Sequence, residues 1–382
     1  MRITIIGWYG TETIGDRAIL AGLISLFNKA YDAFEIKLGS SYPFFSERTL
    51  NEDYSFYKEI TKKDIKIDMF NSQSSKELVT AIKNSDLVAM GGGPLMDLNE
   101  LFMVEYAFKK AKKLGIKTAL LGCGVGPLFH KKFRKSVLSI VQNSDLSILR
   151  DQKSKDNLED IYKQYNLSFE GSLIKTSFDP AVECVLEYNK LYQKKEQDYV
   201  AINLREFPVA YNEQNESKNI NDELKNIVKS VSVKYPNRPI RLIPMHYFHI
   251  GGDDRVFLNS IALSLKAKNI HVQNSNLTLK ETIEVYQNAF INIGMRFHSV
   301  VLQTVSSGKN FVLDYTEPKK GKISGFLQDI DTNGFYVSRY ISLQKDKINS
   351  EFINNEGLKF EINIQEINNY LKIYIDELKE LK

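Results

Sequence analysis

The stretch Met1–Leu20, MRITIIGWYGTETIGDRAIL, decides the fold of this chain. Its residues 2–6, RITII, form a short apolar run rich in β-branched residues, and a glycine-rich turn follows. Beyond the turn, apolar residues recur with helical spacing and lie on one face, namely Ile19, Leu20, Leu23, Phe27 and Tyr31. A strand that passes through glycines into an amphipathic helix predicts the first unit of a parallel α/β sheet.

The same alternation of short apolar runs and longer helical patterns continues along the chain. The predicted strands are 2–6, 35–38, 87–90, 117–121, 146–149, 199–204, 240–243, 270–272, 290–293 and 310–313. Because strands that alternate with helices form parallel sheets covered by helices, the fold class is α/β.

The order of these elements predicts two domains. The segment Leu186–Asp198 is polar and rich in lysine, and a new strand starts directly after it. We therefore expect an N-terminal domain over 1–190 and a C-terminal domain over 191–382, each doubly wound and Rossmann-like, facing a cleft. The last helix, Ile364–Leu381, is expected to pack across both domains or on the second domain alone.

Length and composition fit this architecture and exclude several classes. The 382 residues suit two domains, and 43% hydrophobic with 26% charged residues excludes a disordered chain. A net charge of +4 does not indicate nucleic acid, but it is compatible with phosphorylated ligands or an anionic membrane surface. The sequence has two cysteines, Cys123 and Cys184, without a paired spacing, which excludes a disulfide framework. No signal peptide or membrane span is visible, so we expect a cytoplasmic protein that can visit the inner face of the membrane.

Three glycine-rich loops follow predicted strands of the first domain. They are Gly7–Asp16, Gly91–Asp97 and Gly122–Leu128, and none matches the dinucleotide or the phosphate-loop motif. Glycines at strand ends let backbone amides approach a ligand, and ligands of open α/β sheets bind at that edge. The candidate binding residues in these loops are Gly92, Gly93, Asp97 and Gly124. Asp16 begins the first helix, where it is either an N-cap or a catalytic acid.

Basic residues follow other strands. Arg296 and His298 stand between the strand 290–293 and a helix, and a guanidinium forks onto carboxylate or phosphate while a histidine exchanges protons near neutral pH. Arg150, Arg205 and His246 also come at strand ends, and one of Lys319, Lys320 and Lys322 can reach a phosphate. The sequence therefore predicts an anion site. The set His246, His249, Asp253 and Asp254 matches no strong metal motif, and we expect no metal.

These motifs, in this order, resemble the polysaccharide pyruvyl transferase family. The family's opening turn, G-Y-Y-G-x-x-N-x-G-D-E-A-I-L, reads GWYGTETIGDRAIL here, and later elements match at 91–97, 122–128, 150–154, 179–181, 294–298 and 315–319. Two departures are Thr13, where the family has asparagine, and Arg17, where it has glutamate; both could alter acceptor recognition.

The resemblance implies a fold like that of the GT-B glycosyltransferases, phosphoenolpyruvate as the donor, no cofactor, and a sugar or lipid-linked oligosaccharide as the acceptor. The product would be a pyruvate ketal in a capsule, exopolysaccharide or cell-wall precursor. Arg296 and Arg205 would hold the donor with Arg150 or Lys322 assisting, and His246 would line the site. His298 would be the acid–base residue, and Asp16 and Asp97 would serve the acceptor.

Two other functions stay open at this point. A GT-B glycosyltransferase that uses a nucleotide-sugar would show the same glycine loops and fold class. A non-catalytic sugar- or phosphate-binding protein would bind the same ligands without turnover. The acceptor sugar, the bridged hydroxyls and the oligomeric state are not fixed by these residues.

Overall fold

A computed structural model describes most of the chain. The described residues are 1–11, 13–91, 93–208, 214–248, 252–317, 321–346, 353 and 357–381, and for 214–218 the description covers the backbone alone. The chain divides into two compact units. Unit 1 comprises 1–12, 16–187 and 363–382, and unit 2 comprises 13–15 and 188–362.

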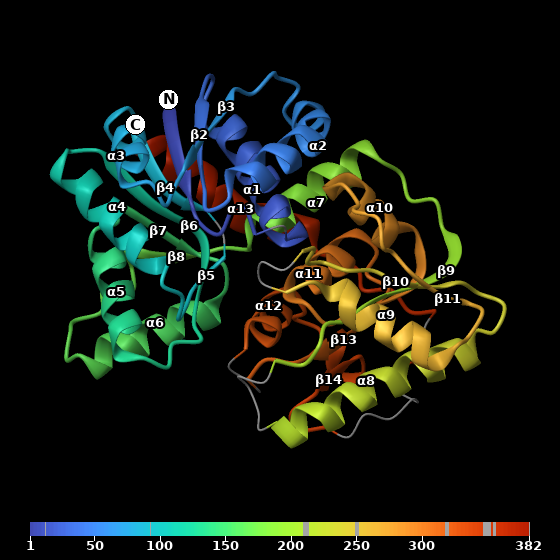
Figure 1. Cartoon of the computed structure of the whole chain (residues 1–382). Helices are drawn as coiled ribbons and strands as arrows, with labels where there is room; N and C mark the ends of the chain where they lie inside the picture. Colours follow the sequence, from blue (N-terminus) through green and yellow to red (C-terminus); the bar gives the residue numbers. More distant parts are fainter. Residues whose placement is uncertain are drawn as a thin grey trace. The chain divides into compact units, whose positions relative to one another are not determined.

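Unit 1 is built on an eight-stranded sheet in which every described pairing is parallel (Figure 1). Its strands are β1 (Arg2–Ile6), β2 (Glu35–Ser40), β3 (Ile67–Asn71), β4 (Leu87–Gly91), β5 (Pro94–Leu95), β6 (Lys117–Val125), β7 (Leu146–Leu149) and β8 (Ile174–Thr176). The order is β3-β2-β1-β4-β6-β7-β8, and β5 pairs with β6. The strand order changes direction between β1 and β4, which is where ligands bind in open α/β sheets.

Helices cover this sheet and close its core. They are α1 (Ile14–Ala30), α2 (Pro43–Thr61), α3 (Ser75–Lys83), α4 (Leu101–Lys113), α5 (Lys131–Gln142), α6 (Gln152–Gln164) and α7 (Pro180–Leu191). One core cluster joins the inward faces of α3, α4 and α5 to β4 and β6, with Val88, Phe108 and Leu120 fully buried. The apolar runs of the strands are continuous because both sheet faces are covered.

The final helix, α13 (Ile364–Glu380), belongs to unit 1. The hydroxyl of Tyr374 donates to the backbone oxygen of Phe178. The hydroxyl of Tyr31 donates to the backbone oxygen of Leu378. This placement differs from the expected position on the second domain alone, and packing across both domains stays a prediction. The reason is its apolar stripe, since Ile367, Leu371, Tyr374 and Leu378 are all buried.

Unit 2 holds a six-stranded parallel sheet in the order β11-β10-β9-β12-β13-β14. The strands are β9 (Gln197–Asn203), β10 (Ile240–Leu242), β11 (Ile270–Val272), β12 (Ala289–Gly294), β13 (Asn310–Asp314) and β14 (Tyr340–Ser342). The other elements are α8 (Gln214–Lys234), α9 (Asp254–Leu265), α10 (Leu279–Asn288), α11 (Phe297–Ser306), α12 (Lys322–Ile330) and the 3₁₀ turn η2 (Phe335–Ser338). Here the order changes direction between β9 and β12.

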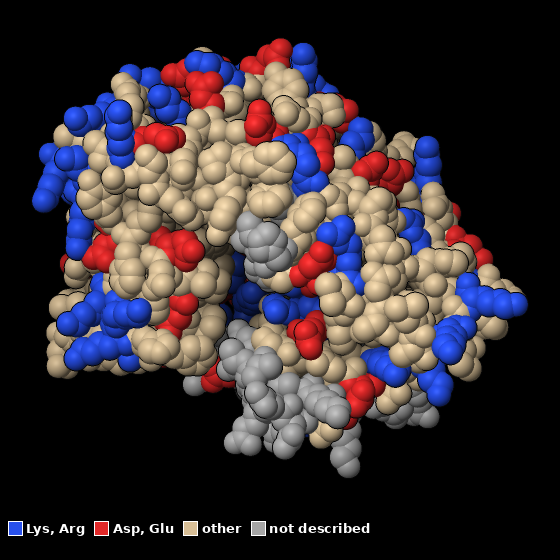
Figure 2. All heavy atoms as spheres, in the orientation of Figure 1, with Lys and Arg blue, Asp and Glu red and all other residues tan. Residues whose placement is uncertain are grey.

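The predicted fold class is confirmed, and all ten predicted strands are present. Four further strands were missed: β3, β5, β8 and β14. In the part of the chain that the structure describes, no helix has the length and apolar composition required to cross a membrane. Basic and acidic side chains are interspersed over most of the face shown in Figure 2.

Candidate active site

The carboxyl ends of β9, β10 and β12 are joined by one buried side chain, Asn203. Its amide nitrogen donates to the backbone oxygen of Ile243 at 2.8 Å, and its amide oxygen accepts from the backbone nitrogen of Arg296 at 3.0 Å. Asn203 is fully buried, so both bonds are shielded from water. The result is a rigid platform at the point where the strand order of unit 2 reverses.

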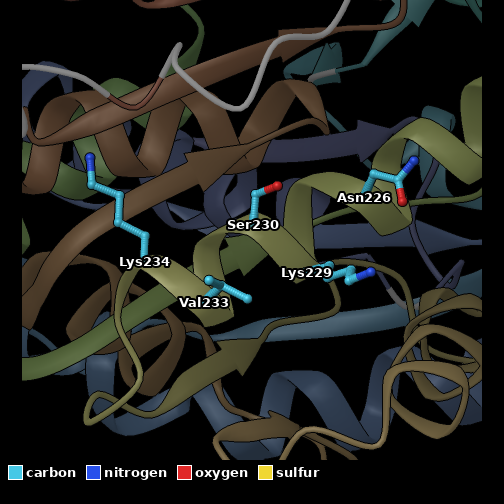
Figure 3. Close-up of a pocket in the computed structure, with 5 residues that line it drawn as sticks. All are labelled: Asn226, Lys229, Ser230, Val233 and Lys234. Atoms are coloured by element: carbon cyan, nitrogen blue, oxygen red, sulfur yellow. The ribbon is translucent and has the colours of Figure 1, made fainter.

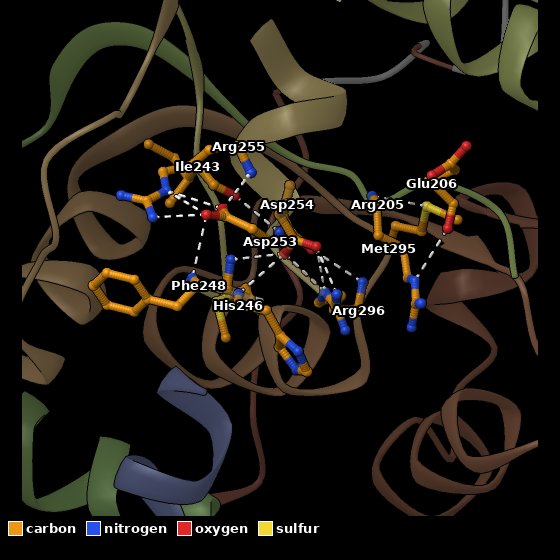
Figure 4. A network of polar contacts seen from close by, with 12 residues as sticks. Arg205, Glu206, Ile243, His246, Phe248, Asp253, Asp254, Arg255, Met295 and Arg296 are labelled. Carbon is orange, nitrogen blue, oxygen red and sulfur yellow. Dashed lines mark hydrogen bonds and ion pairs between the residues drawn. The ribbon is translucent and has the colours of Figure 1, made fainter. Parts of the chain in front are cut away.

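Arg296 follows this platform as the N-cap residue of α11. Its side chain contacts Asp254, the first residue of α9 (Figure 4). The Nε atom of Arg296 lies 2.8 Å from Oδ2 of Asp254, and Nη2 lies 2.5 Å from Oδ1. Oδ2 also accepts from the backbone nitrogens of Met245 and His246. Within the described residues Nη1 of Arg296 makes no hydrogen bond, so one edge of the guanidinium is held and the other can face a ligand.

A second arginine and a lysine converge on Tyr315, the residue after β13. The Cζ atom of Arg205 lies 5.4 Å from the centre of the Tyr315 ring, and Nζ of Lys322 lies 5.8 Å from it. Burial, reinforced by the charge of Arg296, lowers the pKa of Arg205 below its usual value. The structure thus brings together three predicted donor residues, Arg205, Arg296 and Lys322.

The pKa of the Tyr315 phenol reflects the positive charges around it. Burial opposes ionisation of its phenol, but the charges of Lys322, Arg205 and Arg296 outweigh burial and lower the pKa to about 8. The local potential is therefore positive despite the presence of Asp254. A site of this kind favours a small anion.

Two histidines lie in the same unit as this cluster, beside the segment Thr13–Gly15. Thr13 and His246 form an isolated antiparallel bridge, and the backbone nitrogen of Ile14 donates to the oxygen of Met245 at 3.0 Å. A Cβ atom on Gly15 would lie 2.0 Å from Nδ1 of His298, so only glycine leaves room for this imidazole. Thr13, a departure from the family pattern, therefore serves as a backbone partner of His246.

The glycine loops of unit 1 gather at the carboxyl edge of its own sheet. Gly93 has a φ of +75°, and a Cβ there would lie 2.0 Å from the Trp8 ring. The Trp8 indole nitrogen donates to the backbone oxygen of Pro94, so the loops after β1 and β4 are packed together. Asp16 is the third residue of α1 and therefore not its N-cap, and its carboxylate accepts from the hydroxyl of Thr11 at 3.2 Å.

Arg150 and Gly124 form a packed pair in unit 1. A Cβ on Gly124 would lie 2.5 Å from Nη2 of Arg150, so the guanidinium lies flat on the strand end. The side chain of Arg150 is 2% exposed, and its partners are Asp151 at 3.3 Å and Asp179 at 3.8 Å. The structure thus gives Arg150 a clear packing role, and its contact with the donor stays a prediction.

Asp97 holds an exposed histidine that the sequence did not single out. Its Oδ2 atom accepts from the backbone nitrogens of Phe129 and His130, and it lies 2.6 Å from Nδ1 of His130. A carboxylate that fixes one ring nitrogen orients the other toward solvent. The only sequence signal for this pair is its position, because both residues follow strands of one sheet.

Arg17 is the other departure from the family pattern, and it is buried. Its Nε and Nη2 atoms each lie 2.6 Å from an oxygen of Asp53 in α2, and Glu52 lies 3.1 Å away. Although burial disfavours its charge, the Asp53 carboxylate raises the pKa of Arg17. The geometry assigns Arg17 to the joint between α1 and α2.

Four predicted candidates, Gly92, His249, Lys319 and Lys320, lie outside the described residues. Among the residues that are described, no group of three or more His, Cys, Asp or Glu side chains could hold a metal ion. Asp253, considered with the metal candidates, instead caps α9 and pairs with Arg255 at 2.7 Å.

An open hollow on unit 2 runs along α8 (Figure 3). It is lined by Asn226, Lys229, Ser230, Val233 and Lys234. These residues occupy the C-terminal half of α8, and a crossover helix runs antiparallel to its strands. The hollow is therefore far along the helix from the carboxyl edge of the sheet, and we do not assign it to catalysis.

Known structures share this architecture at low sequence identity. The UDP-GlcNAc 2-epimerase from Neisseria meningitidis bound to UDP-GlcNAc matches with a TM-score of 0.52 and 13% identity over 99% of this chain and 94% of that one. MnaA of S. aureus with UDP matches with a TM-score of 0.56 and 10% identity over 99% and 90%. The lipopolysaccharide outer core galactosyltransferase WaaB matches with a TM-score of 0.50 and 12% identity over 100% and 99%. No curated protein sequence matches the chain.

These likenesses and the two parallel sheets define a GT-B-like protein with two Rossmann-like units. The cationic cluster of Arg205, Arg296 and Lys322 lies at the switch point of the second sheet. The family model for polysaccharide pyruvyl transferase matches residues 14–315, and the chain belongs to that family. The family predicted from the motifs is therefore confirmed.

Proposed function

We propose that this chain transfers the enolpyruvyl group of phosphoenolpyruvate to a sugar of a cell-surface glycan precursor and forms a pyruvate ketal. One observation carries the proposal: Arg205 and Lys322 lie 5.4 and 5.8 Å from the centre of the buried Tyr315 ring, and together with Arg296 they lower the pKa of its phenol to about 8. Phosphoenolpyruvate offers a carboxylate and a phosphate, and such a pair of anions matches several fixed cations.

The chemistry assigns a task to each group. One sugar hydroxyl adds to the carbon that bears the phosphate, and the methylene carbon gains a proton to become a methyl group. A second hydroxyl of the sugar then displaces inorganic phosphate, which leaves the ketal. Arg205 and Arg296 hold the two anionic groups and stabilise the departing phosphate, and Lys322 assists them.

His298 is the acid–base residue of this proposal. It stands in the first turn of α11, two residues after Arg296, where it can deliver the proton to the methylene carbon. His246 lines the donor site through its place beside Asp254. In unit 1, Asp16 and Asp97 are proposed to orient the acceptor hydroxyls, and Gly92, Gly93 and Gly124 to leave room for the sugar.

The test measures donor choice and turnover separately. Phosphoenolpyruvate at about 100 times its dissociation constant should stabilise the full chain by about 2.7 kcal/mol, whereas nucleotide-sugars should not stabilise it. Arg296→Ala should lower phosphate release by about 100-fold or more. His298→Ala should reduce turnover while the chain still binds phosphoenolpyruvate. Full turnover by His298→Ala with an authentic acceptor would refute its assigned role.

The alternative is a glycosyltransferase that uses a nucleotide-sugar. It is favoured by the solved structures of similar fold, one of which is bound to UDP-GlcNAc and another to UDP. Stabilisation by a nucleotide-sugar alone, with no competition from phosphoenolpyruvate, would establish this alternative and exclude the pyruvyl transfer.

A further inference from the structure

Unit 1 exposes a group of large apolar side chains that its core does not use. Leu98, Phe102 and Tyr106 repeat every four residues on the outer face of α4 and of the turn before it, and they are 36%, 38% and 45% exposed. Phe129, directly before α5, is 60% exposed. We call these four residues the aromatic face.

The aromatic face is one continuous surface. The ring of Phe102 stacks on that of Phe133 in α5 with 5.2 Å between ring centres. The backbone nitrogen of Phe129 donates to Asp97, the residue before Leu98. The turn before α4 and the turn before α5 are therefore held side by side. The exposed rings belong to the same side of the unit.

Lysines border the aromatic face, and we call Lys131, Lys132 and Lys135 the lysine rim. All three are exposed in the first turns of α5, and in the described part of the chain none of them forms an ion pair. These cations stand at the N-terminus of α5, which is the positive end of the helix dipole. The first turn of α5 has no acidic residue that would offset this positive charge. An external anion would relieve that unfavourable arrangement.

The span from Asp97 to Gln142 has nine Lys and Arg residues and three Asp and Glu residues. Four of the nine basic residues belong to α5 beside the aromatic face, and the other five lie between Lys109 and Lys117, at the end of α4 and the start of β6. Figure 2 shows blue side chains gathered over the side of unit 1 where Figure 1 places α4 and α5. Nζ of Lys132 lies 4.6 Å from the centre of the Phe133 ring, so its aliphatic stem covers apolar surface while its charge stays outside.

We propose that the aromatic face and the lysine rim dock unit 1 on an anionic lipid surface. Aromatic side chains favour the interfacial layer of a bilayer, and each lysine near it gains from the negative headgroups. An acidic protein partner would also suit the lysines, but it would give the exposed rings no apolar layer to enter. The charge and the rings together favour lipid.

The position of this surface connects it to the proposed function, on which this part of the inference rests. The aromatic face lies where α4 and α5 begin, which is the carboxyl edge of the sheet that also carries Gly93 and Gly124. A membrane bound there would bring a lipid-linked acceptor to the loops that we assign to the acceptor. Docking would thus raise the local acceptor concentration.

The experiment measures binding of the full chain to vesicles of phosphatidylcholine alone and of phosphatidylcholine with phosphatidylglycerol. We expect binding to the anionic vesicles that weakens with salt. Lys131→Gln with Lys132→Gln should weaken binding by about 25-fold, since each lysine contributes about fivefold. Phe129→Ser with Tyr106→Ser should weaken it at least as strongly.

Matched variants on other surfaces of the chain control for general effects. Phe44→Ser in α2 removes a ring that is 76% exposed, and Lys372→Gln with Lys379→Gln removes two exposed charges of α13. Both should bind vesicles like the unaltered chain.

Three outcomes would each overturn the proposal. They are an equal loss of binding in the control variants, no binding to anionic vesicles, and a dimer in solution that the aromatic-face variants convert to monomers. Stabilisation by phosphoenolpyruvate is read separately, so a failed donor assignment does not imitate a failed membrane assignment.

Discussion

The guanidinium of Arg296 and the carboxylate of Asp254 form a two-pronged ion pair in which Nε lies 2.8 Å from Oδ2 and Nη2 lies 2.5 Å from Oδ1. Both residues are buried, at 7% and 4% exposure. The same carboxylate also accepts from two backbone nitrogens of the loop after β10. Asp254 therefore fixes the orientation of Arg296 before any ligand arrives, and this preorganisation is what a cation in a catalytic site requires.

Asp254→Ala should destabilise unit 2 strongly. The change leaves the Arg296 charge buried without its carboxylate, and removal of one partner of a buried pair costs about 3–5 kcal/mol. Chemical denaturation measures the free energy of unfolding. Asp253→Ala is the control, because it removes a neighbouring carboxylate that caps α9 and should cost about 1 kcal/mol. Equal costs for the two variants would contradict the special role of Asp254.

Tyr315 should make donor binding depend on pH. Its pKa of about 8 lies below the ordinary value, so the phenolate forms as the pH rises from about 7 to 9 and cancels one positive charge of the cluster. The affinity for phosphoenolpyruvate should fall over that range. Titration calorimetry at several pH values measures it.

Tyr315→Phe is the control for this pH dependence, because it keeps the ring and removes the titrating hydroxyl. Its affinity should stay flat through pH 8. The folded state favours the phenolate, so the ionisation of Tyr315 also adds stability above the unfolded pKa of about 10, and that stability is lost as the pH falls through about 8. An unchanged pH profile in the variant would contradict the assignment.

Arg17→Glu, which introduces the residue typical of the family, should destabilise unit 1. The new carboxylate would face Asp53 and Glu52 in a buried place where the guanidinium now lies 2.6 Å from Asp53. We expect a loss of about 3–5 kcal/mol in the free energy of unfolding. The double variant Arg17→Glu with Asp53→Arg should recover part of it. Arg48→Glu removes a more exposed partner of Glu52 and should cost less than about 1 kcal/mol.

Much of the fold could be predicted because the central strands are continuous apolar runs. The missed strands β3, β8 and β14 lie at the edges of the two sheets, where strands are short and partly exposed. β5 has two residues and lies inside a glycine loop. Such strands carry little periodic signal of their own, and their pairing depends on neighbours that are distant in sequence.

The candidate site was likewise predictable only in part. Arg205 and Arg296 could be placed together because both follow neighbouring strands, β9 and β12. The pairing of Arg296 with Asp254 could not be foreseen, since the two residues are 42 positions apart and Asp254 is the first residue of a helix. The effect of the cluster on Tyr315 also required the folded positions of three cations.

Gly15→Ala should reduce turnover without removing any functional group. The new Cβ would lie 2.0 Å from Nδ1 of His298, so the imidazole must move, and a misplaced catalytic group can cost up to about 100-fold. Steady-state phosphate release measures the loss, and phosphoenolpyruvate binding should change much less. Gly357→Ala is the matched control, since a Cβ there meets no atom within 4 Å and turnover should be unchanged. If Gly15→Ala kept full turnover while remaining folded, the place of His298 beside Gly15 would have no part in the reaction.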